Sequence, residues 1–344
     1  MRTLAVLTTT AAVALLSAAS AEETNSASSA HAGDPLQRAL SSYAAYQIDL
    51  TELRTMRIGN ADALEQAIDK ASRHNRDQLS RGWIAYGANT ASQSPAFVEG
   101  VRQAAARYGR DQVVWAVTID PSYARTLPGG ADATRLVLDS ANADGARIIS
   151  VADRYREQAY SLQRQSWARG VAPSQNARVQ RVRSNGAAGA NVARLGSASQ
   201  RLTVTPVSFS PTSDPTAFGG RRFWDSIQGG SQVVEASASG SPTWRLDAPR
   251  GEAVNRMTAI AALQALNATT EKSSDVDRLL NEPRSRDCIE MSQLQLYQCM
   301  SAARFRYENA FCLGQHAMRD VGQCISAVAR PGATAMTPVT RTGG

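Results

Sequence analysis

Lysine and histidine are scarce in this sequence of 344 residues. Only Lys70 and Lys272 are lysines among its 37 basic residues, and it has three histidines and four cysteines. A serine–lysine hydrolase would therefore have almost no candidate base, and a multi-metal enzyme would lack ligands. No apolar run of 18 residues follows the N-terminus, which excludes a polytopic membrane protein. The nucleophile-elbow, S-x-x-K, H-E-x-x-H and P-loop patterns are absent, so no metal or cofactor site is predicted.

The first 21 residues have the pattern of a secretory signal peptide. Arg2 supplies the positive charge, an apolar stretch follows, and Ala19-Ser20-Ala21 is a small-residue cleavage site. No cysteine lies at this site, so a lipid anchor is not predicted. Residues 22–33 are polar and are expected to form a flexible leader. We therefore expect a bacterial protein of the periplasm or a secreted one, without a transmembrane anchor, in a compartment that permits disulfides.

A mainly α-helical fold is predicted, with an N-terminal helical domain over residues 34–169. Apolar residues recur there at helical spacing, and Asp34 precedes a proline, which is a helix start signal. One helix is expected over residues 60–86 and a long one over residues 131–169, which Gly145 splits. Short connections between helices predict antiparallel neighbours.

Residues 170–250 lack a helical pattern and are predicted to form a basic, irregular linker rich in Arg, Gly and Ser. Within it, residues 202–209 alternate as a short β-strand does. Phe223-Trp224 and residues 243–246 are candidate partners, so a small β element or hairpin is expected. The alternative is that these aromatic residues anchor the linker on the helical domain.

The positive charge of the chain is concentrated in one stretch. Removal of Arg2 with the signal peptide leaves a net charge of +6, yet residues 158–213 contain no Asp or Glu and carry +7. Spaced arginines could bind an anionic polymer, whereas the alternative is a solvated linker whose arginines reflect codon usage. The candidate binding residues are Arg164, Arg169, Arg178, Arg181, Arg183, Arg194 and Arg201.

The helical pattern returns over residues 251–328, and residues 329–344 are predicted to be a disordered tail. The four cysteines all lie in this second helical region, and an even number in an oxidising compartment predicts two disulfides. Three pairings are possible. The spacing of the cysteines along the chain favours a nested pairing in an antiparallel helical hairpin, Cys288 with Cys324 and Cys299 with Cys312, around a turn near Arg306.

Helix geometry leaves a second arrangement open. Cys288 and Cys299 lie within about 20° of each other on an ideal helix, but Cys312 and Cys324 differ by about 120°. The second helix of a nested hairpin must therefore bend or fray, at Gly314 or Gly322. The competing arrangement is one continuous helix through Cys312, since no Gly or Pro interrupts it; Cys299 and Cys312 could then not pair.

Few residues are candidates for catalysis. Cys312 and His316 have the i, i+4 spacing of a thiol and its base, but a cysteine in this cluster is expected to be oxidised. Another histidine, His74, lies in a polar helical stretch. Glu65 and Asp69 have the same spacing, but the basic residues nearby indicate a solvated charged face. The other carboxylates considered in the first domain are Glu52 and Glu99.

Together these features predict an exported envelope protein that acts by binding or scaffolding. Its partner is expected to be an anionic polymer such as peptidoglycan, or an envelope protein, and nucleic acid is disfavoured by the signal peptide. The alternative is a glycan hydrolase that uses carboxylates.

Overall fold

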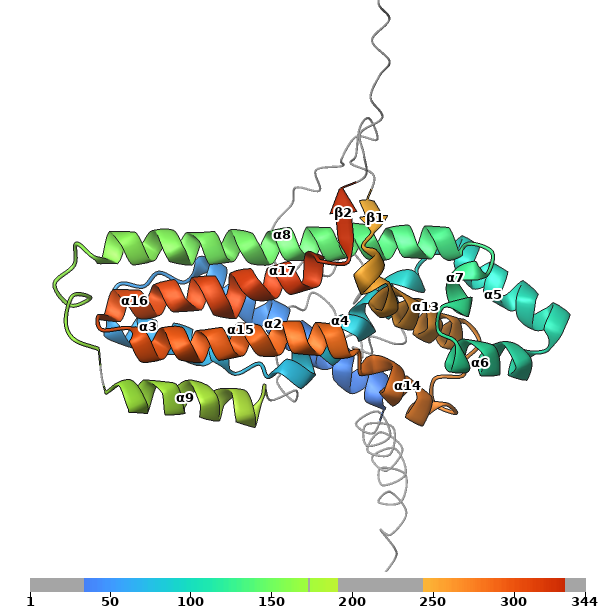
Figure 1. The fold of residues 1–344 in the computed structure, drawn as a ribbon, viewed down its shortest axis with the longest axis horizontal. Helices are drawn as coiled ribbons and strands as arrows, with labels where there is room; N and C mark the ends of the chain where they lie inside the picture. Colours follow the sequence, from blue (N-terminus) through green and yellow to red (C-terminus); the bar gives the residue numbers. More distant parts are fainter. Residues whose placement is uncertain (1–33, 173, 191–243, 332–344) are drawn as a thin grey trace, which may run out of the picture.

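The computed structural model describes residues 34–172, 174–190 and 244–331 and confirms the mainly α-helical class (Figure 1). The predicted signal peptide and leader, the candidate strands at 202–209 and 223–224, Arg194, Arg201 and residues 332–344 lie outside the described residues. The helices are α2 (Pro35–Thr55), α3 (Ala61–Ser72), α4 (Arg76–Ala91), α5 (Pro95–Tyr108), α6 (Arg110–Ile119), α7 (Tyr123–Thr126), α8 (Gly130–Leu162), α9 (Gln175–Ala188), α13 (Gly251–Ala265), α14 (Ser273–Leu280), α15 (Pro283–Ala302), α16 (Arg306–Cys312) and α17 (Asp320–Ser326), with the 3-10 helix η1 (Ala248–Arg250) and the π-helix η2 (Leu313–Arg319).

The long helix α8 runs along most of the molecule, and helices α2, α4, α13, α16 and α17 are among those that pack against it (Figure 1). Its 33 residues span about 50 Å. The predicted split at Gly145 is wrong, because α8 is continuous there. A Cβ atom at Gly145 would lie 2.8 Å from the carbonyl oxygen of Gly322 in α17. Glycine is therefore needed here for the close approach of two helices, not for a break in one.

The predicted helix over residues 60–86 is instead two helices, α3 and α4. Asn60 caps α3 as expected, because its Oδ1 accepts a hydrogen bond from the backbone N–H of Ala63 at 2.8 Å. Asn75 caps α4 in the same way, accepting from the backbone N–H of Gln78 at 2.8 Å. The helical periodicity continues across this short break, which is why only the second cap could have indicated it.

The two helical regions predicted from the sequence share one hydrophobic core. Helix α13 packs on α4, and the chain from α16 to α17 packs along α8. Trp83 and Tyr155 from the first region and Met257 from the second are all buried in this core. Residues 34–169 and 251–328 are therefore packed together in one body.

Parts of the predicted linker and of the predicted tail form regular secondary structure. Residues 175–188, assigned to the linker, form helix α9. The strand β1 (Trp244–Leu246) pairs antiparallel with β2 (Ala329–Pro331), which lies in the predicted tail. The residues at 244–246 thus do form a strand, but their partner in the described structure comes from the other end of the chain.

The disulfides have the nested pairing. Cys288 bonds to Cys324, and Cys299 bonds to Cys312, between the antiparallel α15 and the chain from α16 to α17. The competing continuous helix is excluded, because α15 ends at Ala302 and α16 begins at Arg306.

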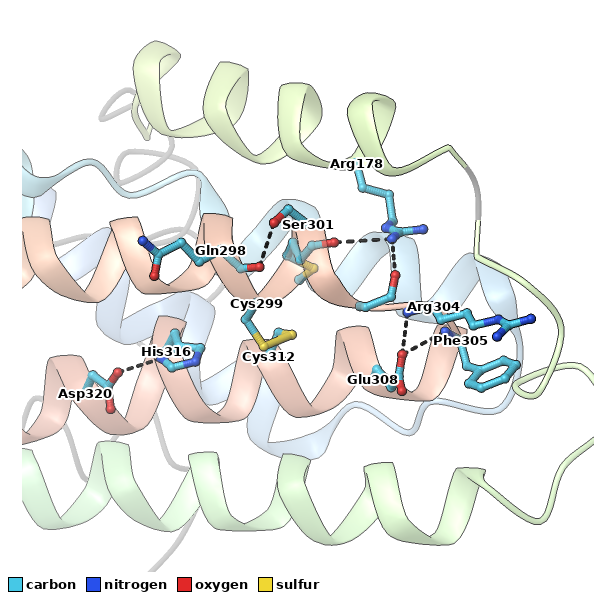
Figure 2. The surroundings of a disulfide bond; sticks show 12 residues. Arg178, Gln298, Cys299, Ser301, Arg304, Phe305, Glu308, Cys312, His316 and Asp320 are labelled. Carbon is cyan, nitrogen blue, oxygen red and sulfur yellow. Dashed lines mark hydrogen bonds and ion pairs between the residues drawn. A yellow bond between two sulfur atoms is a disulfide. The ribbon is translucent and has the colours of Figure 1, made fainter.

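The turn between α15 and α16 contains neither Gly nor Pro, and side chains stabilise both of its helix ends (Figure 2). Glu308 accepts hydrogen bonds from the backbone N–H groups of Arg304 and Phe305, which caps the start of α16. Arg178 of α9 donates to the carbonyl oxygens of Met300 and Ala303 at the end of α15. Because these contacts come partly from another helix, the pattern within residues 285–312 does not reveal the break.

The π-helix η2 corrects the angular mismatch between Cys312 and Cys324. A π turn, with its i→i+5 hydrogen bonds, inserts an extra residue into an α-helix. With one extra residue, the twelve-residue spacing turns about as far as eleven residues of α-helix, so the two cysteines come within about 20° of each other. The predicted irregularity near Gly314 is confirmed, and its form is a local widening of the helix.

Peptide mapping tests this pairing. Cleavage of the unreduced protein with trypsin and then cyanogen bromide places each cysteine in its own peptide: residues 287–291, 292–300, 307–318 and 320–336. We expect the first peptide to be linked to the last and the two middle peptides to each other. Reduction should separate both pairs, and a link between residues 287–291 and 307–318 would contradict the nested hairpin.

Candidate functional site

The end of the molecule where α8 leads to α9 and α15 turns into α16 is the strongest candidate site (left in Figure 1). We call residues 160–171 together with residues 302–311 the basic tip. Two backbone hydrogen bonds join its segments. The N–H of Tyr307 donates to the Ala168 carbonyl at 3.3 Å, and directly after the first segment the N–H of Ala172 donates to the Arg304 carbonyl at 3.0 Å. The tip is therefore a connected surface.

Positive charge predominates on the basic tip. Arg164, Arg169 and Arg304 are exposed, and Arg306 is partly buried and donates to the Trp167 carbonyl at 3.3 Å. Glu308 is the single acidic residue of the two segments. With four cations and one anion, the tip has a net charge of +3 and favours an anionic ligand.

Aromatic side chains line a groove on the same tip. The Tyr160 ring, which is 60% exposed, meets the Phe311 ring edge-on at a centroid distance of 6.5 Å. The groove has a volume of about 400 Å³ and passes beside the Cys299–Cys312 disulfide. It is lined by Ala159, Tyr160, Gln163, Cys299, Ala302, Ala303, Tyr307, Glu308, Phe311 and Cys312. The volume is at the small end of the range for ligand pockets.

The predicted arginines do not act as one group. Arg164 and Arg169 lie on the basic tip, whereas Arg178, Arg181 and Arg183 attach α9 to the rest of the molecule. Burial lowers the pKa of Arg178, whose guanidinium holds the end of α15 (Figure 2).

The next two arginines of α9 bind α3 and α15. Arg181 donates to Asp69 through two nitrogens at 2.8 and 2.6 Å and also pairs with Glu65. Arg183 lies over the Tyr297 ring, 5.5 Å from its centroid. Glu65 and Asp69 lie on a partly exposed charged face, as predicted, and this face is also where α9 docks.

Helix α9 is held mainly by polar contacts. Only Arg178, Val182 and Gly186 are buried among its residues. Beyond its end, Gln78 of α4 exchanges two hydrogen bonds with the backbone of Ala190, at 2.8 and 3.1 Å. A helix with so little buried apolar surface depends on its ion pairs and its contact with the end of α15.

Cys312 and His316 do not form a catalytic pair. Cys312 is bonded to Cys299, and His316 Nδ1 lies 2.8 Å from Asp320 Oδ2 (Figure 2). A disulfide sulfur is not a thiolate, so the nucleophile that this pattern would need is absent here.

A second pair of a histidine and an aspartate, His74 and Asp49, was not predicted from the sequence. His74 lies in the α3–α4 connection rather than on a polar helix, is buried, and has its Nε2 2.7 Å from Asp49 Oδ2. Arg73 Nε also donates to Asp49, at 2.6 Å. Burial raises the pKa of Asp49, but the hydrogen bonds from His74 and Arg73 outweigh burial and hold it below its usual range. Asp49 lines neither the groove on the tip nor the larger groove described below, so we assign this cluster to stability.

The remaining predicted carboxylates have neighbours that account for them. Glu52 pairs with Lys70, and Glu99 accepts a hydrogen bond from Gln103 at 2.9 Å. A deeper carboxylate, Asp144, accepts from Tyr43 at 2.9 Å; burial raises its pKa above the usual range, although nearby Arg147 opposes this.

A larger groove, with a volume of about 770 Å³, lies at the Cys288–Cys324 disulfide. Two of the residues that line it are carboxylates, Asp287 and Asp320, and two are arginines, Arg250 and Arg284. Met291, which is 54% exposed, adds an apolar contact. This groove is more mixed in charge than the basic tip.

Comparison of the chain with protein-family models, curated proteins and solved structures gives no match. Within the described part of the chain, every helix is too short or too polar to cross a membrane.

Substitution of Asp49 tests the buried cluster. Because its pKa is lowered in the folded state, its contribution to stability is complete above about pH 4 and is lost as the pH falls through the folded value. Asp49→Asn should lower the free energy of unfolding by about 3 kcal/mol at pH 7 and by less at pH 3, measured by urea unfolding. Glu52→Gln, at an exposed pair, should cost less than about 1 kcal/mol at both values. An Asp49→Asn cost that does not change with pH would contradict this assignment.

Substitution of Arg178 tests how α9 is attached. Arg178→Ala leaves the Met300 and Ala303 carbonyls without their buried donor, which we expect to cost about 1 to 3 kcal/mol of local stability. Hydrogen exchange of the α9 amides should accelerate by about tenfold or more, while exchange in α8 stays unchanged. Arg164→Ala, at an exposed position, is the matched control. Equal α9 protection in both variants would show that other contacts hold this helix.

Proposed function

We propose that the protein is exported to the periplasm or secreted, and that it binds an anionic polymer of the cell envelope, such as peptidoglycan, through the basic tip. The N-terminal sequence pattern supports export. Two disulfides in the described structure are compatible with an oxidising compartment.

The exposed arginines of the basic tip are the observation that carries this proposal. Arg164, Arg169 and Arg304 come from two distant parts of the sequence, and their segments are joined by backbone hydrogen bonds. A planar guanidinium is suited to the carboxylates and phosphates of envelope polymers. The same tip offers aromatic surface and a groove, so binding there would combine charge with shape.

Cosedimentation with purified peptidoglycan tests the proposal. Replacing Arg164, Arg169 and Arg304 with Gln should weaken binding by about tenfold, because each exposed ion pair contributes up to about 1 kcal/mol. Raising sodium chloride from about 50 mM to about 500 mM should weaken binding of the native protein and have less effect on the variant.

A control with the same charge change is available at the other end of the molecule. Arg102, Arg107 and Arg135 are exposed on α5 and α8, far from the basic tip (Figure 1). Replacing these three with Gln should leave binding close to that of the native protein. Equal loss in both triple variants would mean that net charge alone drives binding, and no loss in the first variant would refute the proposed site.

The hydrolase alternative has one supporting observation, since Asp287 and Asp320 line the same groove. Release of soluble fragments from peptidoglycan, abolished in Asp287→Asn, would favour hydrolysis over binding alone.

A further inference from the structure

We propose that the groove on the basic tip binds a sugar ring of a glycan chain, with Tyr160 as its stacking surface. This inference rests on the proposed function and specifies the ligand: a polymer whose sugar rings enter the groove while its anionic groups meet the arginines.

The aromatic wall is open to solvent and held in place. Tyr160 is 60% exposed on α8, and its ring contacts Phe311 of α16. The guanidinium carbon of Arg156 lies 5.7 Å from the centroid of the Phe311 ring. This cation–π contact helps to hold the Phe311 ring in position. The electron-rich face of such a ring attracts the weakly positive C–H groups on one face of a sugar. An exposed ring held in a defined position is well suited to stack on that face.

Polar groups at the groove match the hydroxyls of a sugar. Glu308 uses its Oε2 to cap α16, and its Oε1 has no hydrogen-bond partner among the described residues. The side-chain amide of Gln163 is likewise without a partner in the described part of the chain, and the Tyr160 hydroxyl belongs to an exposed ring. A carboxylate oxygen accepts from hydroxyls, whereas an amide and a phenol both donate and accept. Such a set serves a ligand rich in hydroxyl groups better than an acyl chain, which would leave these groups unpaired.

The surrounding charge indicates that the glycan is anionic or carries anionic substituents. Arg164 and Arg304 belong to the same two segments that form the groove, and both are exposed. A polyanion without sugar rings would engage these arginines but would gain nothing from Tyr160. This difference separates the two ligand chemistries in an experiment.

Two probes distinguish them with the mature protein and intact disulfides. One is a neutral oligomer of N-acetylglucosamine, and the other is polyglutamate, which has carboxylates but no sugar. Tyr160→Ala should weaken binding of the neutral oligomer by about tenfold and leave polyglutamate binding within about twofold. Replacing Arg164, Arg169 and Arg304 with Gln should have the reverse effect. Titration calorimetry at a fixed salt concentration measures the affinity of each variant for both probes.

Tyr108→Ala is the matched control, because Tyr108 is 56% exposed at the opposite end of the molecule. Gln163→Ala provides a second variant within the groove that leaves both aromatic rings in place, and it should also weaken binding of the neutral oligomer. Near-ultraviolet circular dichroism should show that each variant is folded.

The inference is overturned if the neutral oligomer does not bind, or if Tyr160→Ala affects it no more than Tyr108→Ala does. In either case the proposed function stands, provided that peptidoglycan binding still depends on the three arginines. If instead the arginine variant binds peptidoglycan as the native protein does while Tyr160→Ala does not, the groove is a neutral glycan site and the anionic component of the proposal is wrong.

Discussion

The C-terminal hairpin depends on one geometric constraint: both disulfides must face the same neighbouring helix. Cys288 and Cys299 meet it through ordinary α-helical spacing, but Cys312 and Cys324 do not. The π-helix η2 supplies the missing rotation and so makes two bonds between the same pair of helices compatible. The rotation also determines which face of the helical segment from α16 to α17 meets α8. Gly314 lies within η2, where a Cβ would be 2.8 Å from the Ala152 carbonyl oxygen of α8, so the widened segment packs directly on the long helix.

The turn of this hairpin connects the fold to the candidate site. Arg178 and Glu308 stabilise the two helix ends that meet there, and the same turn presents Arg304 and Phe305 on the basic tip (Figure 2). The Cys299–Cys312 disulfide is the one closer to the turn along the chain, and it lines the groove on the basic tip. The proposed binding surface and the covalent cross-link are therefore built on the same short segment. A ligand at the tip would meet a preorganised surface, which reduces the entropy lost on binding.

Local signals in the sequence predicted what depends on local interactions. The caps at Asp34 and Asn60, the helical class and the nested cysteines all follow from spacing and from the preferences of single residues. The features that were missed depend on residues far apart in the chain. His74 is buried because Asp49 of α2 accepts its hydrogen bond, and α9 is helical where Arg181 can reach Asp69 of α3. Neither partner is recognisable from the pattern around the residue itself.

The arginine-rich stretch shows why a charge count along the chain is an incomplete guide to a binding surface. Three of its arginines lie within six residues of one another on α9, yet one is buried, one pairs with two carboxylates and one packs on a ring. Arg178 is buried and Arg181 is paired with its two carboxylates, so only Arg183, which lies over a ring, keeps an exposed charge on α9. On the basic tip, Arg164 and Arg169 are both exposed, and Arg304 joins them from a region without unusual composition. Electrostatic attraction at a distance depends on unpaired, exposed charge. The basic tip therefore has a stronger claim to an anionic partner than the acid-free stretch as a whole.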